Sequence, residues 1–306
     1  TRDVYYVDNM TVAKLTKETI EFYNVDKEII DVPLNHVDWD YEAAEKGGYE
    51  HFMLKEIYEQ PKAISDTLNP HIVDGKIELP ELNLSDEEIK KISRIYIVAC
   101  GSAYHAGVVG KYVIEGMAGI PVEIDIASEF RYRKPILDKD GLVIVISQSG
   151  ETADTKEAVK LAKEAGNKVL AIVNVVGSSI ARDAENVLYT AAGPEISVAT
   201  TKAYSAQLVA LYLISIHFAQ IRGKVSDEEV EAYIRELKKL LPCEDIVYFG
   251  DTGRVPYGTR SRDTILRYAQ QDMRFLLSKN VKMIIAACGT VSSILGDGVD
   301  VSVPFT

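Results

Sequence analysis

A run of small polar residues directly follows the most apolar stretch of the chain. Residues 142–146 are Leu-Val-Ile-Val-Ile and residues 147–152 are Ser-Gln-Ser-Gly-Glu-Thr. The apolar run predicts a strand buried on both faces, and the helix-forming residues after Thr152 predict a helix. A helix N-terminus has unpaired N–H groups and a partial positive charge, and hydroxyls there add further donors for an anion. The pattern predicts a phosphate site at Ser147, Ser149 and Thr152; the alternative is an ordinary turn with one hydroxyl as helix cap.

Strand-like and helix-like runs alternate from residue 85 onwards, which is typical of a parallel sheet covered by helices. The strands are predicted at residues 94–99, 122–126, 142–146, 168–173 and 187–190. Three of them end in small polar groups, at residues 99–103, 147–152 and 172–179. Ligands of such sheets bind beyond the carboxyl ends of the strands, so we expect one shared pocket. The predicted class is α/β, a three-layer α-β-α domain with a mainly parallel five-stranded sheet.

Residues 193–203, Gly-Pro-Glu-Ile-Ser-Val-Ala-Thr-Thr-Lys-Ala, precede a long apolar helix expected from residue 199 to about 221. Two interpretations are open. Ser197, Thr200 and Thr201 with the charge of Lys202 form a second anion site, or the hydroxyls only cap the helix and Lys202 is solvated.

Composition excludes several function classes. The 306 residues carry a net charge of -12, which disfavours nucleic acid and anionic membranes as partners. No apolar run reaches the ~18 residues of a membrane span. The three cysteines have neither disulfide-framework nor metal-ligand spacing, so we expect a reduced cytoplasmic protein without a metal or cofactor. The chain begins at Thr1 and ends soon after Pro304, and we expect it to be cut at both ends.

The remaining segments give weaker signals. Residues 3–7, 11–15, 19–23 and 28–32 predict small antiparallel strands. Residues 49–60 predict an amphipathic helix broken by Pro61, and residues 85–88, Ser-Asp-Glu-Glu, predict a capping box. Near the C-terminus a helix is predicted at residues 260–278 between strands at 245–249 and 281–286.

Several blocks resemble glutamine–fructose-6-phosphate aminotransferases: residues 49–61, 99–104, 126–134, 147–155 and 198–203. The resemblance covers residues 1 to about 241. It implies binding of fructose 6-phosphate or glucosamine 6-phosphate by a sugar-isomerase (SIS) domain of hexosamine biosynthesis. The implied substrate-binding residues are Cys100, Gly101 and Ser102, which would line the pocket; Ser147, Gln148, Ser149 and Thr152, which would hold the phosphate; and Val198 and Thr200, which would flank the sugar.

That resemblance also implies an incomplete catalytic apparatus. The family's glutaminase cysteine and the glutamate, lysine and histidine of its second SIS subdomain have no counterpart in the sequence. We therefore assign no catalytic residue and expect no glucosamine 6-phosphate to form. Two alternatives are a non-catalytic phosphosugar sensor and a single-SIS isomerase, for which His105 and Glu129 are the candidate groups.

Residues from about 242 to 306 resemble glutamate racemase instead. By that resemblance Cys288 is one of two proton-transferring cysteines, and Tyr257, Gly258 and Thr290 would contact substrate. The other cysteine is missing, and a two-base racemisation cannot run with one base. We therefore expect a fusion of two gene fragments without racemase activity.

The expected organisation has five parts and a homodimer formed through the SIS domain. The parts are a glutaminase-domain remnant (residues 1–48), linker helices (49–84), the SIS domain (85–225), a connecting helix (226–241) and the racemase-like fragment (242–306).

Overall fold

The structure, a computed structural model, describes residues 3–36, 45–239, 251, 254, 260–281, 284 and 291. The chain divides into two compact units. The first comprises residues 1–196 and 200–238, and the second residues 197–199 and 239–306.

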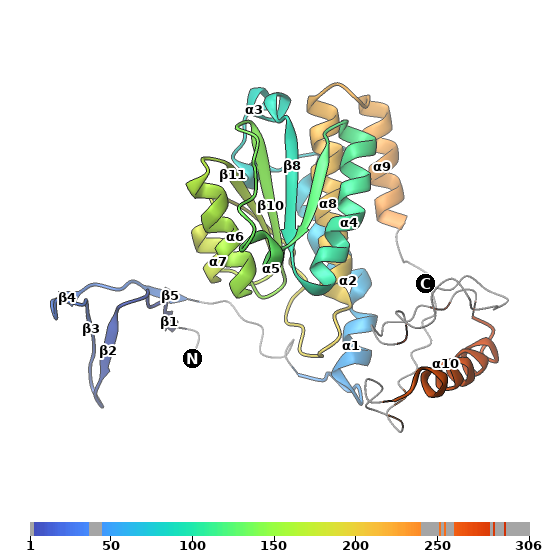
Figure 1. The fold of residues 1–306 in the computed structure, drawn as a ribbon, viewed down its shortest axis with the longest axis horizontal. Coiled ribbons are helices and arrows are strands. Elements are labelled where there is room, and N and C mark those ends of the chain that lie inside the picture. Colours follow the sequence, from blue (N-terminus) through green and yellow to red (C-terminus); the bar gives the residue numbers. More distant parts are fainter. Residues whose placement is uncertain are drawn as a thin grey trace. The chain divides into compact units, whose positions relative to one another are not determined.

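A five-stranded parallel sheet forms the centre of the first unit (Figure 1). Its strands are β8 (Arg94–Ala99), β9 (Val122–Ile126), β10 (Gly141–Ser147), β11 (Lys168–Val173) and β12 (Asn186–Tyr189). They lie in the order β12-β11-β10-β8-β9, and every pairing is parallel. The predicted α/β class and five-stranded sheet are confirmed. All seven residues of β10 are buried, as expected for a central strand covered on both faces.

Helices cover both faces of the sheet, which confirms the three layers (Figure 1). One face carries α4 (Gly101–Ala118) and α8 (Lys202–Ile221), and the other carries α5 (Ala127–Phe130), α6 (Ala153–Glu164) and α7 (Ser179–Asp183). The approach of α4 to the sheet requires glycine at position 107. A Cβ there would lie 2.8 Å from the Ile97 side chain and 2.9 Å from that of Ile124.

Helix α8 is the one helix among the described residues that is long and apolar enough to cross a membrane. Its mean hydropathy over 18 residues is 1.3, but 61% of that window is buried within the fold. It packs against α4 and α2. Burial against neighbouring helices accounts for its apolar sequence, as predicted for a core helix.

Short elements precede the sheet: α1 (Phe52–Tyr58), α2 (Gln60–Leu68), η2 (Asn69–His71), β6 (Ile72–Val73), β7 (Lys76–Ile77), η3 (Pro80–Leu82) and α3 (Asp86–Lys91). The predicted break at Pro61 is confirmed: α1 ends at Tyr58 and a second helix, α2, starts at Gln60. Pro61 stands in the first turn of α2, where no N–H partner is lost. The capping box at Ser85 and Glu88 is confirmed. After α8 the first unit ends with α9 (Asp227–Lys239).

Five short strands occupy residues 3–36: β1 (Asp3–Tyr5), β2 (Val12–Leu15), β3 (Ile20–Tyr23), β4 (Ile29–Ile30) and β5 (Leu34–His36). Their pairings are antiparallel, as predicted. Within this segment only Phe22 is buried. So small a buried surface gives these strands little independent stability.

In the second unit the described residues form α10 (Arg262–Leu277), which confirms the helix predicted at 260–278. Ser261 caps it by accepting a hydrogen bond from the Thr264 N–H, and its apolar side carries Ile265, Ala269 and Met273. The strand predicted at 245–249 lies outside the described residues, as does most of the one at 281–286.

Candidate functional site

The loops after β8 and β10 start side by side at one edge of the sheet. In the parallel pairing of these strands Ala99 lies opposite Ile146. The chain then leaves β8 through α4 on one face and β10 through α6 on the other (Figure 1). Such a divergence between adjacent strands opens a crevice in doubly wound sheets. The predicted residues Cys100–Ser102 and Ser147–Thr152 therefore meet at one edge.

The turn between β10 and α6 is organised by its own hydroxyls. The Oγ of Ser147 lies 2.9 Å from Oγ1 of Thr152 and accepts a hydrogen bond from the Gly150 N–H at 3.1 Å. The Oγ of Ser149 accepts from the Glu151 N–H at 3.2 Å. Ser147 is buried whereas Ser149 is exposed. Ser147 thus shapes the turn, and Ser149 and Thr152 are the hydroxyls nearer to solvent.

Gly150 cannot be replaced without moving this turn. Its φ is +64°, and a Cβ would lie 2.0 Å from Oγ of Ser178. Its carbonyl accepts a hydrogen bond from the Ile180 N–H at 2.9 Å. The turn is therefore packed directly onto the loop that follows β11.

Glu151 ties the same two loops together. One of its oxygens accepts a hydrogen bond from the Ser179 N–H at 2.7 Å. Partial burial acts to raise the pKa of Glu151, but the hydrogen bonds from Ser179 and the charges of Arg182 and Lys156 outweigh it and lower the pKa overall. The carboxylate is therefore ionised at neutral pH and serves the loop rather than a ligand.

Gln148 has an unused polar atom at this edge. Its side-chain Oε1 is buried and has no hydrogen-bond partner among the described residues. A buried acceptor without a partner costs about 1–3 kcal/mol, which a ligand hydroxyl would recover. Gln148 thus keeps a buried acceptor at this edge that no described residue uses.

At the end of β8, Cys100 has extended backbone angles and is the residue before α4. Gly101 opens the helix with φ of +58°, and the side chain of Ser102 is exposed. The N-terminus of α4, with Ser102 in its first turn, thus lies at this edge on the β8 side.

Asn174, at the end of β11, is a connecting residue that the sequence did not single out. Its N–H donates to the Gln148 carbonyl at 3.3 Å. Its side chain accepts from the Ala192 N–H at 2.8 Å and donates to the Gly193 carbonyl at 2.9 Å. The turn at 147–152 and the segment leading to α8 are therefore joined through one residue, Asn174, by its main chain and its side chain.

The segment before α8 is held by carboxylates. Glu195 accepts hydrogen bonds from the Thr201 N–H at 2.8 Å, the Ala203 N–H at 3.2 Å and the Thr200 hydroxyl at 2.7 Å. Thr201 is the N-cap residue of α8, as predicted, but its side chain accepts no capping hydrogen bond. The Glu195 carboxylate accepts the N–H groups instead, and the helix begins at Lys202. Val198 is fully exposed and belongs to the second unit.

Lys202 is neither a countercharge at an open site nor a solvated lysine. It is 3% exposed, and its Nζ donates to Oε2 of Glu59 at 2.6 Å. Both interpretations of this residue are therefore corrected: its charge is neutralised inside the fold. The signal that sequence reasoning lacked is a partner 143 residues away.

The two candidate groups of the isomerase alternative are exposed. His105 lies on α4 with its ring 5.5 Å from that of Tyr104, and Glu129 lies in α5. The four residues of the racemase-like prediction, Tyr257, Gly258, Cys288 and Thr290, lie outside the described residues.

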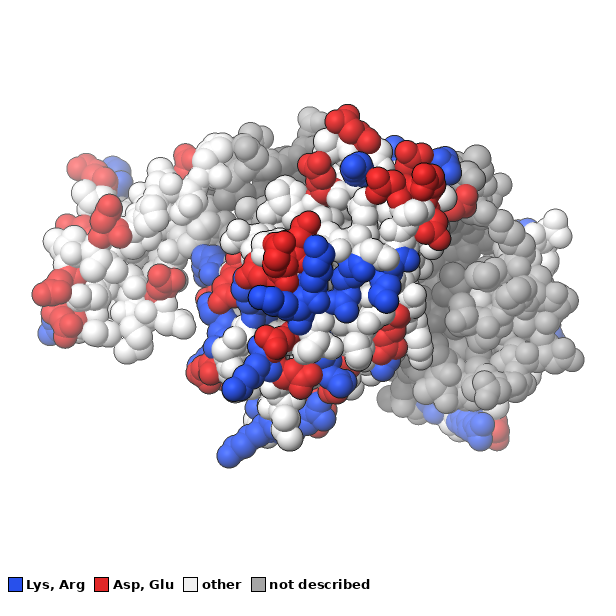
Figure 2. All heavy atoms as spheres, turned by 90° about the horizontal axis from the view of Figure 1, so that it is seen from above, with Lys and Arg blue, Asp and Glu red and all other residues white. Residues whose placement is uncertain are grey.

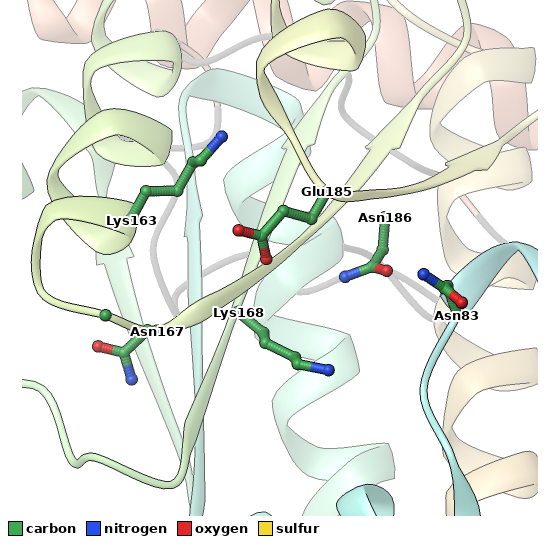
Figure 3. Close-up of a pocket in the computed structure, with 7 residues that line it drawn as sticks. Asn83, Lys163, Asn167, Lys168, Glu185 and Asn186 are labelled. Carbon is green, nitrogen blue, oxygen red and sulfur yellow. The ribbon is translucent and has the colours of Figure 1, made fainter.

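A hollow of about 430 Å³ lies at the opposite, amino end of the strands (Figure 3). Four of its polar side chains, those of Lys163, Asn167, Lys168 and Asn186, are already engaged within the fold. Lys163 donates to the Asp183 carbonyl at 2.8 Å, Asn167 to the Asp138 carbonyl at 2.7 Å, and Lys168 pairs with Glu88. We therefore place the candidate site at the carboxyl edge.

Charge on the surface is mixed. On the face shown in Figure 2 basic side chains gather in a short central band that acidic side chains border. That face has no broad basic area of the kind that binds a phosphodiester backbone.

Residues 88–217 match the family model of the SIS domain. Together with the parallel sheet, whose adjacent strands β8 and β10 lead to helices on opposite faces, this match identifies the central part of the chain as a SIS domain.

Over most of its length the chain is homologous to glutamine–fructose-6-phosphate aminotransferases. It is 59% identical to that of Clostridium acetobutylicum over 232 residues, 76% of this chain and 38% of that protein. It is 59% identical to that of Caldanaerobacter subterraneus over 241 residues, 78% of this chain and 40% of that protein.

The fold is also similar to that of a solved aminotransferase domain. The C-terminal domain of glucosamine-fructose-6-phosphate aminotransferase from Francisella tularensis is 35% identical, with a TM-score of 0.63 over 79% of this chain and 63% of that one. The chain spans about two fifths of the length of the two curated relatives.

Proposed function

We propose that this chain binds a sugar phosphate, fructose 6-phosphate or glucosamine 6-phosphate, at the carboxyl edge of its sheet. The observation that carries the proposal is the turn at 147–152. Three hydroxyls, an unpartnered amide oxygen and the N-terminus of the 12-residue helix α6 are gathered there. Homology with the aminotransferases supports a phosphosugar as the guest.

Different residues would contact different parts of the ligand. Ser149, Thr152 and the first N–H groups of α6 would hold the phosphate, while Ser147 keeps the turn closed around it. Gln148 would accept a sugar hydroxyl, and Cys100, Gly101 and Ser102 would line the β8 side. Val198 and Thr200 would flank the sugar.

Calorimetric titration with glucosamine 6-phosphate tests this function, with glucosamine as the control that lacks the phosphate. We expect a heat of binding with glucosamine 6-phosphate and none with glucosamine. The variant Thr152→Val should weaken binding about tenfold or more, since a hydrogen bond to a charged group contributes about 1.5–3 kcal/mol. Absence of heat with both fructose 6-phosphate and glucosamine 6-phosphate would remove the proposal.

Incubation with fructose 6-phosphate in heavy water distinguishes binding from isomerisation. A single-SIS isomerase, acting through His105 and Glu129, would exchange the C1 proton, whereas a binding protein or a sensor would leave it in place.

The flanking parts are assigned by the same proposal. Residues 1–48 would be a glutaminase-domain remnant, 49–84 linker helices, 85–225 the SIS domain, 226–241 a connecting helix and 242–306 a racemase-like fragment joined by gene fusion. Amplification from cellular DNA across codons 235–250 tests the join: a continuous product would rule out an assembly artefact, and the absence of a product would expose one. We further propose that the protein is cytoplasmic and forms a homodimer through its SIS domain. Sedimentation analysis would reveal the dimer.

A further inference from the structure

Two carboxylates from the helices before the sheet reach the segment that precedes α8. Glu56 lies in α1, and its Oε1 accepts a hydrogen bond from the Ile196 N–H at 2.6 Å. Glu59 follows α1 directly and pairs with Lys202, the first residue of α8. The segment is thus held at both ends from residues about 140 positions away in the chain.

Glu56 is buried, which is unfavourable for a carboxyl side chain. Its side chain is 2% exposed, and burial of an ionised carboxylate is unfavourable unless hydrogen bonds or a counter-charge offset it. Residues 191–200 have no helix or strand, so the regular main-chain hydrogen bonding of such elements does not fix their course. A buried acceptor with fixed geometry supplies what the segment itself lacks.

The held segment carries two predicted sugar contacts, Val198 and Thr200, and its bonds reach Thr200. Glu195 precedes Ile196 and binds the Thr200 hydroxyl at 2.7 Å as well as the start of α8. The Ile196 N–H and the Glu195 carboxylate belong to adjacent residues. A shift of the first therefore moves the second and, through it, Thr200.

We propose that Glu56 is a positioning residue of the phosphosugar site, acting on Thr200 through Ile196 and Glu195. This inference rests on the proposed function. It adds that the affinity of the SIS domain for its sugar depends on a helix outside that domain's matched residues, 88–217.

The test compares three variants of the full chain by calorimetry with glucosamine 6-phosphate and by thermal unfolding. Glu56→Ala removes the acceptor, Glu56→Gln keeps an oxygen in the same place, and Ser205→Ala removes a different bond between these helices and α8. In the native chain the Ser205 hydroxyl donates to Oε1 of Gln60 at 2.7 Å. Ser205→Ala is therefore a control for a general loosening of α8.

We expect Glu56→Ala to raise the dissociation constant about tenfold, which is 1.4 kcal/mol. Glu56→Gln should restore it to within about threefold of the native value, and Ser205→Ala should leave it unchanged. If Glu56→Ala does not fold, Glu56→Asp takes its place, since it withdraws the carboxylate by one methylene, and the same loss is expected.

Three results would overturn the inference: native affinity in Glu56→Ala or Glu56→Asp, equal weakening in Glu56→Ala and Ser205→Ala, or no rescue by Glu56→Gln. A native chain that binds no sugar phosphate would instead refute the proposed function, so the two failures are distinguishable.

Discussion

The two regions of the candidate site differ in how far away in the chain their supports lie. The turn at 147–152 has bonds among its own residues, Ser147 with Thr152 and Gly150, and Ser149 with Glu151, and its outside partners are in the loop that follows β11. The segment at 193–203 also has internal bonds through Glu195, but Glu56 and Glu59, which hold it, are about 140 positions away. The shape of the turn therefore depends on its immediate neighbours, whereas the segment depends on where the distant helix α1 packs.

The largest effect on stability and binding is expected from Gly150→Val in the turn at 147–152. A β-branched residue at positive φ is strained, and the new side chain would overlap Ser178. We expect the free energy of unfolding to fall by ~3 kcal/mol and sugar-phosphate binding to be lost. Denaturant unfolding and calorimetry measure both; unchanged binding would show that the turn is not the phosphate site.

Lys202→Met tests the externally held segment. Removing the ammonium leaves the Glu59 carboxylate with one buried partner fewer, and we expect a loss of ~2 kcal/mol in unfolding free energy. The matched control is Lys62→Met, whose exposed pair with Asp66 should contribute less than ~0.5 kcal/mol. Equal effects of the two variants would mean that burial of Lys202 has no energetic consequence.

Ser147→Ala and Ser149→Ala divide shaping from binding within the turn. Ser147→Ala leaves the buried Gly150 N–H without its acceptor and should cost ~1 kcal/mol of stability. The exposed Ser149→Ala should leave the melting temperature within error while it weakens sugar-phosphate binding. The reverse assignment, with Ser149 stabilising and Ser147 not, would contradict the division.

Acidification gives the smallest effect and acts on neither region directly. Burial in α8 lowers the pKa of His217 below its usual value of 6.5, although the Ile77 carbonyl opposes the shift. The stability linked to this residue is therefore complete above about pH 6.5 and is lost as the pH falls towards the lower folded-state pKa. Melting temperatures from pH 7 to 5 should fall less in His217→Gln than in the native chain.

The strands and the turn could be predicted because their causes are local. Apolar runs bounded by polar residues located β8, β9 and β11 at their observed limits. Hydroxyl and glycine spacing located the turn. By contrast, the burial of Lys202 and the capping role of Glu195 depend on where α1 packs. The sequence of residues 193–203 does not predict the packing of α1. The contact of Asn174 with Gly193 was likewise invisible, since an asparagine after a strand is also an ordinary turn residue.

The carboxylate of Glu195 has one more consequence. It already occupies the N–H groups at the start of α8, so that helix end carries its own negative charge and repels a second. At the start of α6 the first helical residues instead leave N–H groups without an internal acceptor. A monosaccharide with one dianionic end would meet attraction on one side and repulsion on the other, and could therefore enter in a single orientation.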